Sequence, residues 1–140
     1  MIEIINRQRR REINLKEWRE FGAQAFSAIG STRDATIVFV SDRSIRDLNR
    51  RFRGKDYATD VLSFPSNAEV FETEDQSHLG EVVISVQRAA AQARLNRLSF
   101  SNEVKQLILH GLLHLCGYDH ETDHGEMNRL ELRLRKQLGI

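Results

Sequence analysis

Alternation of hydrophobic and polar residues predicts four short strands. Residues 1–6 (MIEIIN) open as a strand, and residues 35–41 (ATIVFVS) form a second run rich in β-branched side chains. Two further runs follow at residues 60–65 (DVLSFP) and 79–85 (LGEVVIS). Pro65 is expected to stop the first of these, because proline has no N–H to extend a strand ladder. The pattern alone does not give the order of the strands.

Helical spacing of apolar residues fills the first intervals between the strands. The stretch 15–30 repeats apolar residues at helical intervals and ends on Gly30, at a position where glycine commonly caps a helix. A second helix is predicted through residues 44–52, with its N-cap at either Ser41 or Asp42.

Three more helices are expected from residue 86 to the end of the chain. They cover residues 86–98, residues 101–117 starting from a Ser101 cap, and residues 121–138. Four strands with about five helices indicate an α+β layered fold, a small four-stranded mixed sheet covered by helices.

Length and composition indicate one globular domain, residues 1–140. The chain is 40% hydrophobic and 29% charged, and its one expected flexible insert is the acidic stretch 66–78. Neither a signal-peptide core nor an apolar run near the roughly 18 residues of a membrane span is present in the sequence. The lone Cys116 suits a reducing compartment. We therefore expect a soluble, cytoplasmic protein.

The small net charge of +1 hides local clusters of arginine. Arginine outnumbers lysine 17 to 4, and basic residues gather at 7–11 and 46–55. Guanidinium groups match phosphate oxygens in pairs, which favours a polyanionic partner, while a solvated charged face explains the same clusters on charge alone.

The stretch HGLLHLCGYDH, residues 110–120, carries the clearest chemical signal. On a helix His110 and His114 stand about one turn apart on one face, where they can share a metal ion. His120 reaches the same ion only if the chain turns back, and Gly117 permits that turn because glycine adopts a left-handed backbone freely. Chance gives this spacing somewhere in such a chain roughly three times in ten thousand.

Three imidazoles with a fourth position open are typical of catalytic rather than structural zinc. The sequence resembles a zinc-protease helix in which Gly111 replaces the glutamate that serves as general base. Peptide hydrolysis by that mechanism is therefore disfavoured. Zinc still activates water or polarises a phosphoryl oxygen, so a phosphodiester substrate is chemically reasonable.

Three segments resemble the YbeY family of bacterial endoribonucleases and rRNA maturation factors. They are residues 49–65 (NRRFRGKDYATDVLSFP), residues 79–85 and residues 110–120. The order of elements agrees along nearly the whole chain. Ala58 stands where proline is common in the family, a departure that concerns only local loop geometry.

The resemblance implies a zincin-like metal-site helix and a single-strand-specific, metal-dependent endoribonuclease of the cytoplasm. Such an enzyme acts in 16S rRNA 3′-end maturation and in ribosome quality control, with single-stranded RNA and the small ribosomal subunit as partners. The family's metal ligands fall on His110, His114 and His120, which would hold one Zn²⁺ per chain. Its functional arginine falls on Arg53.

The expected catalytic residues are thus Arg53 and His110, with Arg53 binding a phosphate of the RNA. The attacking group, either water or the substrate 2′-OH, is left open. Asp60 and Ser63 either line the cleft or serve as turn and cap residues. Basic residues expected to steer RNA rather than act in chemistry are Arg50, Arg51 and Lys55.

Two other functions fit the same residues. A ribosome-assembly factor could use zinc only to stabilise its fold, and a metal hydrolase could act on another substrate. Removal of the metal separates the first of these from an enzyme, because a structural zinc takes the fold with it.

Overall fold

The computed structural model describes residues 1–66 and 78–140, which contain four strands and five helices. In chain order these elements are β1 (Ile2–Asn6), α1 (Leu15–Ile29), β2 (Asp34–Val40), α2 (Asp42–Arg53), β3 (Val61–Pro65), β4 (His78–Ser85), α3 (Val86–Asn96), α4 (Phe100–Leu115) and α5 (Glu126–Leu138). The predicted α+β fold is therefore confirmed. Of the predicted insert, residues 67–77 lie outside the described residues.

The strands form one mixed sheet in the order β1-β2-β4-β3. β1, β2 and β4 run parallel, with Ile4 opposite Ile37 and Ile37 opposite Val82. β3 runs antiparallel to β4 and forms the edge of the sheet, with Ser63 opposite Val82. Pro65 is the last residue of β3. At the end of an edge strand, the missing N–H of proline costs the sheet least.

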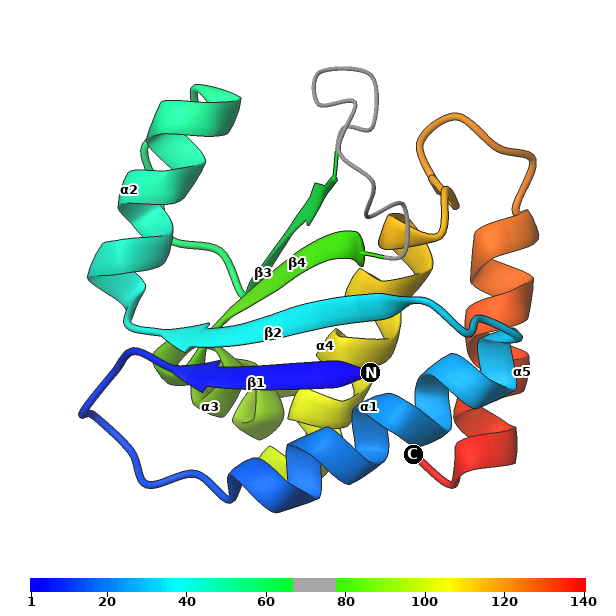
Figure 1. Cartoon of the computed structure of the whole chain (residues 1–140). Helices are drawn as coiled ribbons and strands as arrows, with labels where there is room; N and C mark the ends of the chain where they lie inside the picture. The colour runs from blue at the N-terminus through cyan, green and yellow to red at the C-terminus, as the bar shows by residue number, and fades with distance from the viewer. Residues whose placement is uncertain (67–77) are drawn as a thin grey trace.

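Alternate residues of the strands enter two separate cores. Ile37 and Phe39 face the larger core, together with Val82 of β4. Val38 and Val83 face the other way and pack with Ile45 of α2 in a smaller core. Figure 1 shows α2 across the sheet from α1, α4 and α5. The start of α2 contacts α3.

Helix α4 lies at the centre of the larger core. It packs against β3, β4, α1, α3 and α5, as expected of a helix that is apolar nearly all round. Its N-cap is Ser99, whose hydroxyl accepts the Asn102 N–H at 3.0 Å, so the predicted cap at Ser101 is wrong. Ser101 already lies in the first turn, and its hydroxyl donates to Glu17 of α1 at 2.6 Å.

Helix α5 begins five residues later than predicted. Gly125 has a left-handed backbone (φ 95°), which interrupts the helix before Glu126. The Asp123 carboxylate accepts the N–H groups of Gly125 and Met127, at 2.8 and 2.9 Å. These bonds satisfy the exposed start of α5 and lower the pKa of Asp123.

Two other predicted helix ends agree with the structure, whereas α3 and α4 end at Asn96 and Leu115, each two residues before the predicted last residue. Gly30 caps α1 in the left-handed conformation. Of the two candidate caps of α2, Ser41 is the one, because its hydroxyl accepts the Ser44 N–H. Within residues 1–66 and 78–140, no helix has the length and apolar composition needed to cross a membrane.

The contact of α4 with the sheet yields a prediction for Gly111→Ala. A Cβ at residue 111 would lie 2.5 Å from Val82 Cγ1, so the substitution should lower the free energy of unfolding by about 1–3 kcal/mol in spite of alanine's better helix propensity. Urea unfolding measures this cost. In a Val82→Ala background, which removes both crowding methyl groups, the cost should shrink or vanish. Equal costs in the two backgrounds would contradict the steric explanation.

Candidate metal centre

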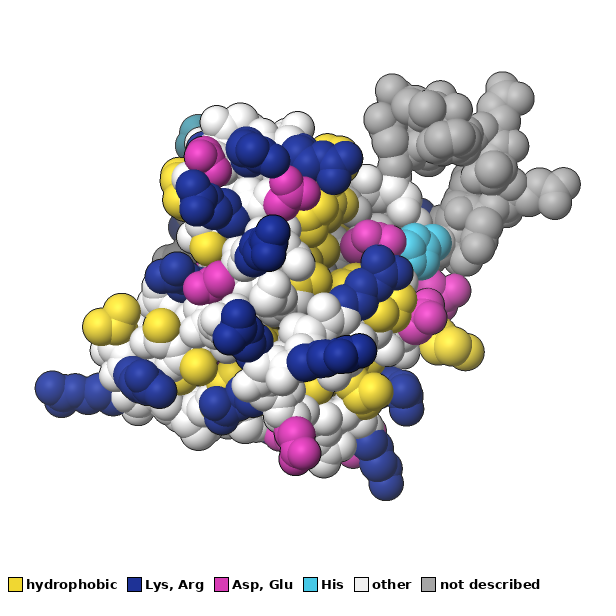
Figure 2. Space-filling view, turned by 90° about the vertical axis from the view of Figure 1, so that its left-hand side faces the viewer, with side chains coloured by type: hydrophobic (Ala, Val, Ile, Leu, Met, Phe, Trp, Pro, Cys, Tyr) yellow, Lys and Arg dark blue, Asp and Glu magenta, His cyan; other side chains and the backbone are white. Residues whose placement is uncertain are grey.

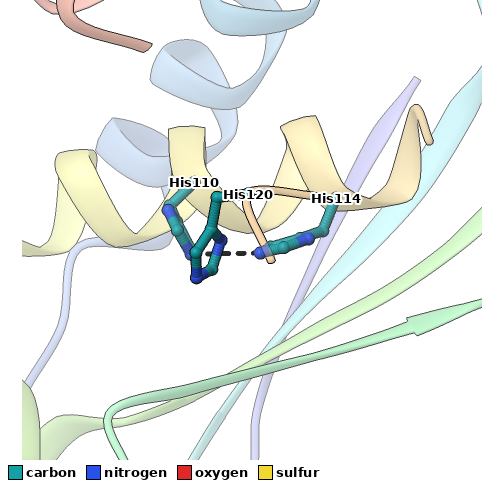
Figure 3. A group of neighbouring side chains, drawn as sticks. All are labelled: His110, His114 and His120. Carbon is teal, nitrogen blue, oxygen red and sulfur yellow. Dashed lines mark hydrogen bonds between the residues drawn. The ribbon is translucent and has the colours of Figure 1, made fainter. Parts of the chain in front are cut away.

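The end of α4 and the turn after it bring three histidines together. His110 and His114 occupy successive turns of α4. The helix ends where the N–H groups of Gly117 and Tyr118 bond back to the carbonyls of His114 and Leu113, at 3.0 and 3.1 Å. Gly117 has a φ of 97°, and the reversed chain returns His120 toward the other two rings (Figure 3).

The spacing of the three imidazoles fits one divalent cation. One ring nitrogen from each histidine lies within 4.8 Å of the other two. The Nε2 atoms of His110 and His114 are 3.2 Å apart. Two nitrogens bonded to one tetrahedral zinc at about 2.0–2.1 Å would be separated by about 3.3 Å. Among the residues that the structure describes, the donor set is three imidazoles with no fourth protein ligand, which suits an open site.

A buried carboxylate orients the first of these rings. His110 Nδ1 lies 3.1 and 3.2 Å from the two carboxylate oxygens of Glu131 in α5. Glu131 is only 6% exposed and also accepts a hydrogen bond from Arg135 at 3.0 Å. Because the Glu131 carboxylate accepts a hydrogen bond from His110 Nδ1–H, the Nε2 lone pair is left for a metal.

The pKa values around these rings follow from burial and from their neighbours. Burial raises the pKa of Glu131, but its hydrogen bond with His110 and the charges of His110 and Arg135 outweigh this, so the net shift is downward. Burial lowers the pKa of His114, and the nearby His110 and His120 lower it further. Both shifts favour an ionised carboxylate and a neutral imidazole, the forms needed for metal binding.

Glu131 was not among the residues singled out from the sequence. A signal was present, since residue 131 lies four positions after Met127 and three before Leu134, on the buried side of α5. A carboxylate on such a face requires a partner. The sequence does not show that this partner is a histidine 21 residues away.

The three histidines open into a cavity of about 490 Å³. Its lining includes Arg53 and Lys55, and also Ser63 of β3 and Asp60, the residue before β3. The structure thus brings Arg53, predicted as a catalytic residue, into one cavity with the histidines. Asp60 has a turn role as well, because its carboxylate accepts the Val61 N–H at 2.8 Å.

Arg53 is the last residue of α2 and is exposed. Within the described part of the chain its guanidinium has no hydrogen bond or ion pair, whereas Arg50 and Arg51 both pair with Asp47. The loop after α2 is held by Asn49, which is 2% exposed and donates to the Tyr57 carbonyl at 2.9 Å. Arg53 therefore stands on a fixed helix end with its charge available to an anion.

Of the three basic residues predicted to steer RNA, one lines the metal cavity. Lys55 lines the metal cavity, while Arg50 and Arg51 lie outside it. Figure 2 shows Lys and Arg side chains spread over the face that carries α2, with acidic side chains among them. The ion pairs with Asp47 leave this surface less positive than the arginine count suggests.

The structure gives a physical reason for glycine at position 111. The side of α4 that would carry the glutamate of a zinc protease faces the sheet, where a Cβ would lie 2.5 Å from Val82 Cγ1. The Ser63 hydroxyl donates to the Gly111 carbonyl at 3.3 Å, which ties α4 to the edge strand. A longer side chain at residue 111 would require the two layers to separate.

Three further residues near the histidine cluster are not among its possible metal ligands. The Asp119 carboxylate accepts the Glu121 N–H at 3.0 Å, as in a turn, although Asp119 also lines the cavity. His124 is exposed and is not one of the three clustered histidines. Cys116 is half-buried against the larger core, and burial raises the pKa of its thiol.

Comparisons with known proteins show which family this chain resembles. The sequence profile of the family described as "Endoribonuclease YbeY" matches residues 3–139. A protein named endoribonuclease YbeY from Alkaliphilus metalliredigens is 40% identical over 98% of this chain and 94% of its own length. One from Helicobacter pylori is 42% identical over 81% of this chain and 78% of its own.

A solved structure has the same fold. The solution structure of TM1509 from Thermotoga maritima superimposes with a TM-score of 0.66 over 99% of this chain and 89% of that one, at 26% identity. Together with the family match over nearly the whole length, these similarities show that the chain belongs to the endoribonuclease YbeY family.

Proposed function

We propose that this chain, acting as one domain of residues 1–140, is a single-strand-specific, metal-dependent endoribonuclease. Its substrate is rRNA, and its role is 16S rRNA 3′-end maturation and ribosome quality control in the cytoplasm, in contact with the small ribosomal subunit. One observation carries most of the proposal: three converging imidazoles and an arginine without a described partner share a single cavity. Membership of the endoribonuclease YbeY family supports the same activity.

His110, His114 and His120 are the proposed ligands of one Zn²⁺. Their nitrogen donors and the 3.2 Å spacing of two of them suit this ion, and the depressed pKa of His114 keeps that ring neutral. Zinc bound there would act as a Lewis acid toward a phosphodiester. Within residues 1–66 and 78–140, three possible protein ligands converge rather than four, which favours an open site over a closed structural one.

The protein's own side chains supply orientation and charge. Glu131 holds the His110 ring in place. His110 is a proposed ligand of the metal and, with Arg53, a proposed catalytic residue. Arg53 binds the scissile phosphate or its neighbour and offsets the negative charge that develops on the phosphate oxygens during cleavage. Lys55, beside Arg53 in the cavity, attracts the RNA backbone.

Cleavage of a defined single-stranded RNA tests the proposed activity. Zinc-loaded wild type should cleave it, His114→Ala should lose both zinc and activity, and Arg53→Ala should keep zinc but lose about 10²–10³-fold in kcat. Metal analysis of each protein accompanies the kinetics.

The exposed Arg133→Ala serves as the matched arginine control and should leave both quantities unchanged. Equal cleavage by wild type and His114→Ala would reveal a contaminating nuclease and overturn the proposal. Zinc-loaded, folded wild type without cleavage would favour a non-catalytic assembly factor instead.

Glu131→Gln tests the proposed support of the metal site. The substitution keeps the shape of the side chain but removes the charge that orients and polarises His110, so zinc affinity should fall by about 10–100-fold. Competition with a chromophoric chelator measures the affinity, and circular dichroism checks the fold. Glu20→Gln, an exposed carboxylate on α1, should bind zinc as the wild type does. Unchanged affinity in Glu131→Gln would remove Glu131 from the metal site.

A further inference from the structure

A second cavity adjoins the metal cavity on another side of His110. It has a volume of about 490 Å³ and lies between α3, α4 and α5. Asp60, Val61 and His110 line both cavities, so the two meet at the start of β3 and at the first metal-site histidine. A nucleotide next to a phosphate in the metal cavity is therefore within reach of the second one.

Three amide side chains line this second cavity, beside the carboxylates of Asp60, Glu103 and Glu131. Gln92 and Asn96 come from α3, and Gln106 comes from α4. Among the described residues that line it, the only arginine or lysine is Arg135, whose guanidinium bonds to Glu131. Amides carry both a donor and an acceptor, which matches the edge of a nucleobase, whereas a phosphate would need free cations.

Glu103 is a buried carboxylate in the lining of this cavity. It is 4% exposed, yet both of its carboxylate oxygens share a single donor group, Asn96 Nδ2, at 3.3 and 3.1 Å. Within the described residues Glu103 has no ion pair. A buried carboxylate accepts several hydrogen bonds when donors are present, so Glu103 has acceptor capacity left toward the cavity that it lines.

We propose that this cavity is a nucleobase subsite that favours a base with an exocyclic amino group, with Glu103 as the acceptor that reads it. The inference rests on the proposed ribonuclease function and assigns its base preference. Cytosine presents an N4 amino donor where uracil presents the O4 acceptor, which a carboxylate would repel. Gln92 and Gln106 complete the recognition of the remaining polar atoms on the base.

Binding of CMP and UMP to the zinc-loaded protein tests the subsite without any cleavage. CMP should bind about 5- to 150-fold more tightly than UMP, the discrimination of one good base contact. Amide resonances of Gln92, Asn96 and Gln106 in nuclear magnetic resonance spectra should shift with CMP. Glu103→Gln should bring the two affinities together, because the amide that replaces the carboxylate can donate to uracil O4; Glu20→Gln should keep the wild-type ratio.

Cleavage kinetics extend the test to RNA. In two oligonucleotides that differ only by C or U beside the cut, wild type should show the same preference in kcat/KM, and Glu103→Gln should lose it. Gln106→Ala, which leaves the Glu103–Asn96 hydrogen bonds in place, should weaken CMP binding and provides the test if Glu103→Gln does not fold.

The two failures are distinguishable. CMP preference without RNA cleavage would uphold the subsite and overturn the proposed ribonuclease function. Cleavage with equal affinity for CMP and UMP, or a preference that persists in Glu103→Gln, would overturn the subsite alone.

Discussion

The close approach of helix α4 to strand β4 determines the geometry of the whole site. Only a residue without a side chain fits at position 111, because a Cβ there would lie 2.5 Å from Val82 Cγ1. This approach lets the Ser63 hydroxyl of the edge strand reach the Gly111 carbonyl at 3.3 Å. β3 and α4 thus form two walls of one cavity. Gly111, which leaves no room for the glutamate of a zinc protease, also permits the close approach of the two elements.

A single histidine links the chemistry on the two sides of this helix. His110 directs Nε2 toward His114 and Nδ1 toward Glu131, and the Glu131 carboxylate is in turn bound by Arg135. The same histidine lines two cavities. Arg53, which has no partner among the described residues, lines the first, and three amides and three carboxylates, including the buried Glu103, line the second. The two sides of His110 are therefore chemically different, one suited to a phosphate and the other, in our proposal, to a base.

Much of this architecture follows from local sequence patterns. Periodicity predicted the four strands and five helices, because alternation and helical spacing express which side chains are buried. Strand order did not follow, since β2 and β4 are far apart in sequence and nothing local encodes their pairing. The cap of α4 was misplaced by two residues because Ser99 and Ser101 are equally good caps until Ser101 is seen to bond Glu17 on another helix.

Some residues of the candidate site could likewise be predicted from the sequence, and others could not. Spacing along one helix and one turn sufficed to group His110, His114 and His120, while the choice of Arg53 depended on resemblance to a family. Glu131 and Glu103 were missed because each is a carboxylate on an otherwise buried helix face, and its partner lies on another helix. Such partners become visible only after the helices pack.

X-ray absorption spectroscopy of the zinc-loaded wild type tests the central claim most directly. The account predicts a first shell of nitrogen and oxygen at about 2.0–2.1 Å, with three imidazoles in the multiple-scattering pattern and one non-protein ligand. A sulfur shell at about 2.3 Å, which would place Cys116 on the metal, or four imidazole ligands would contradict it.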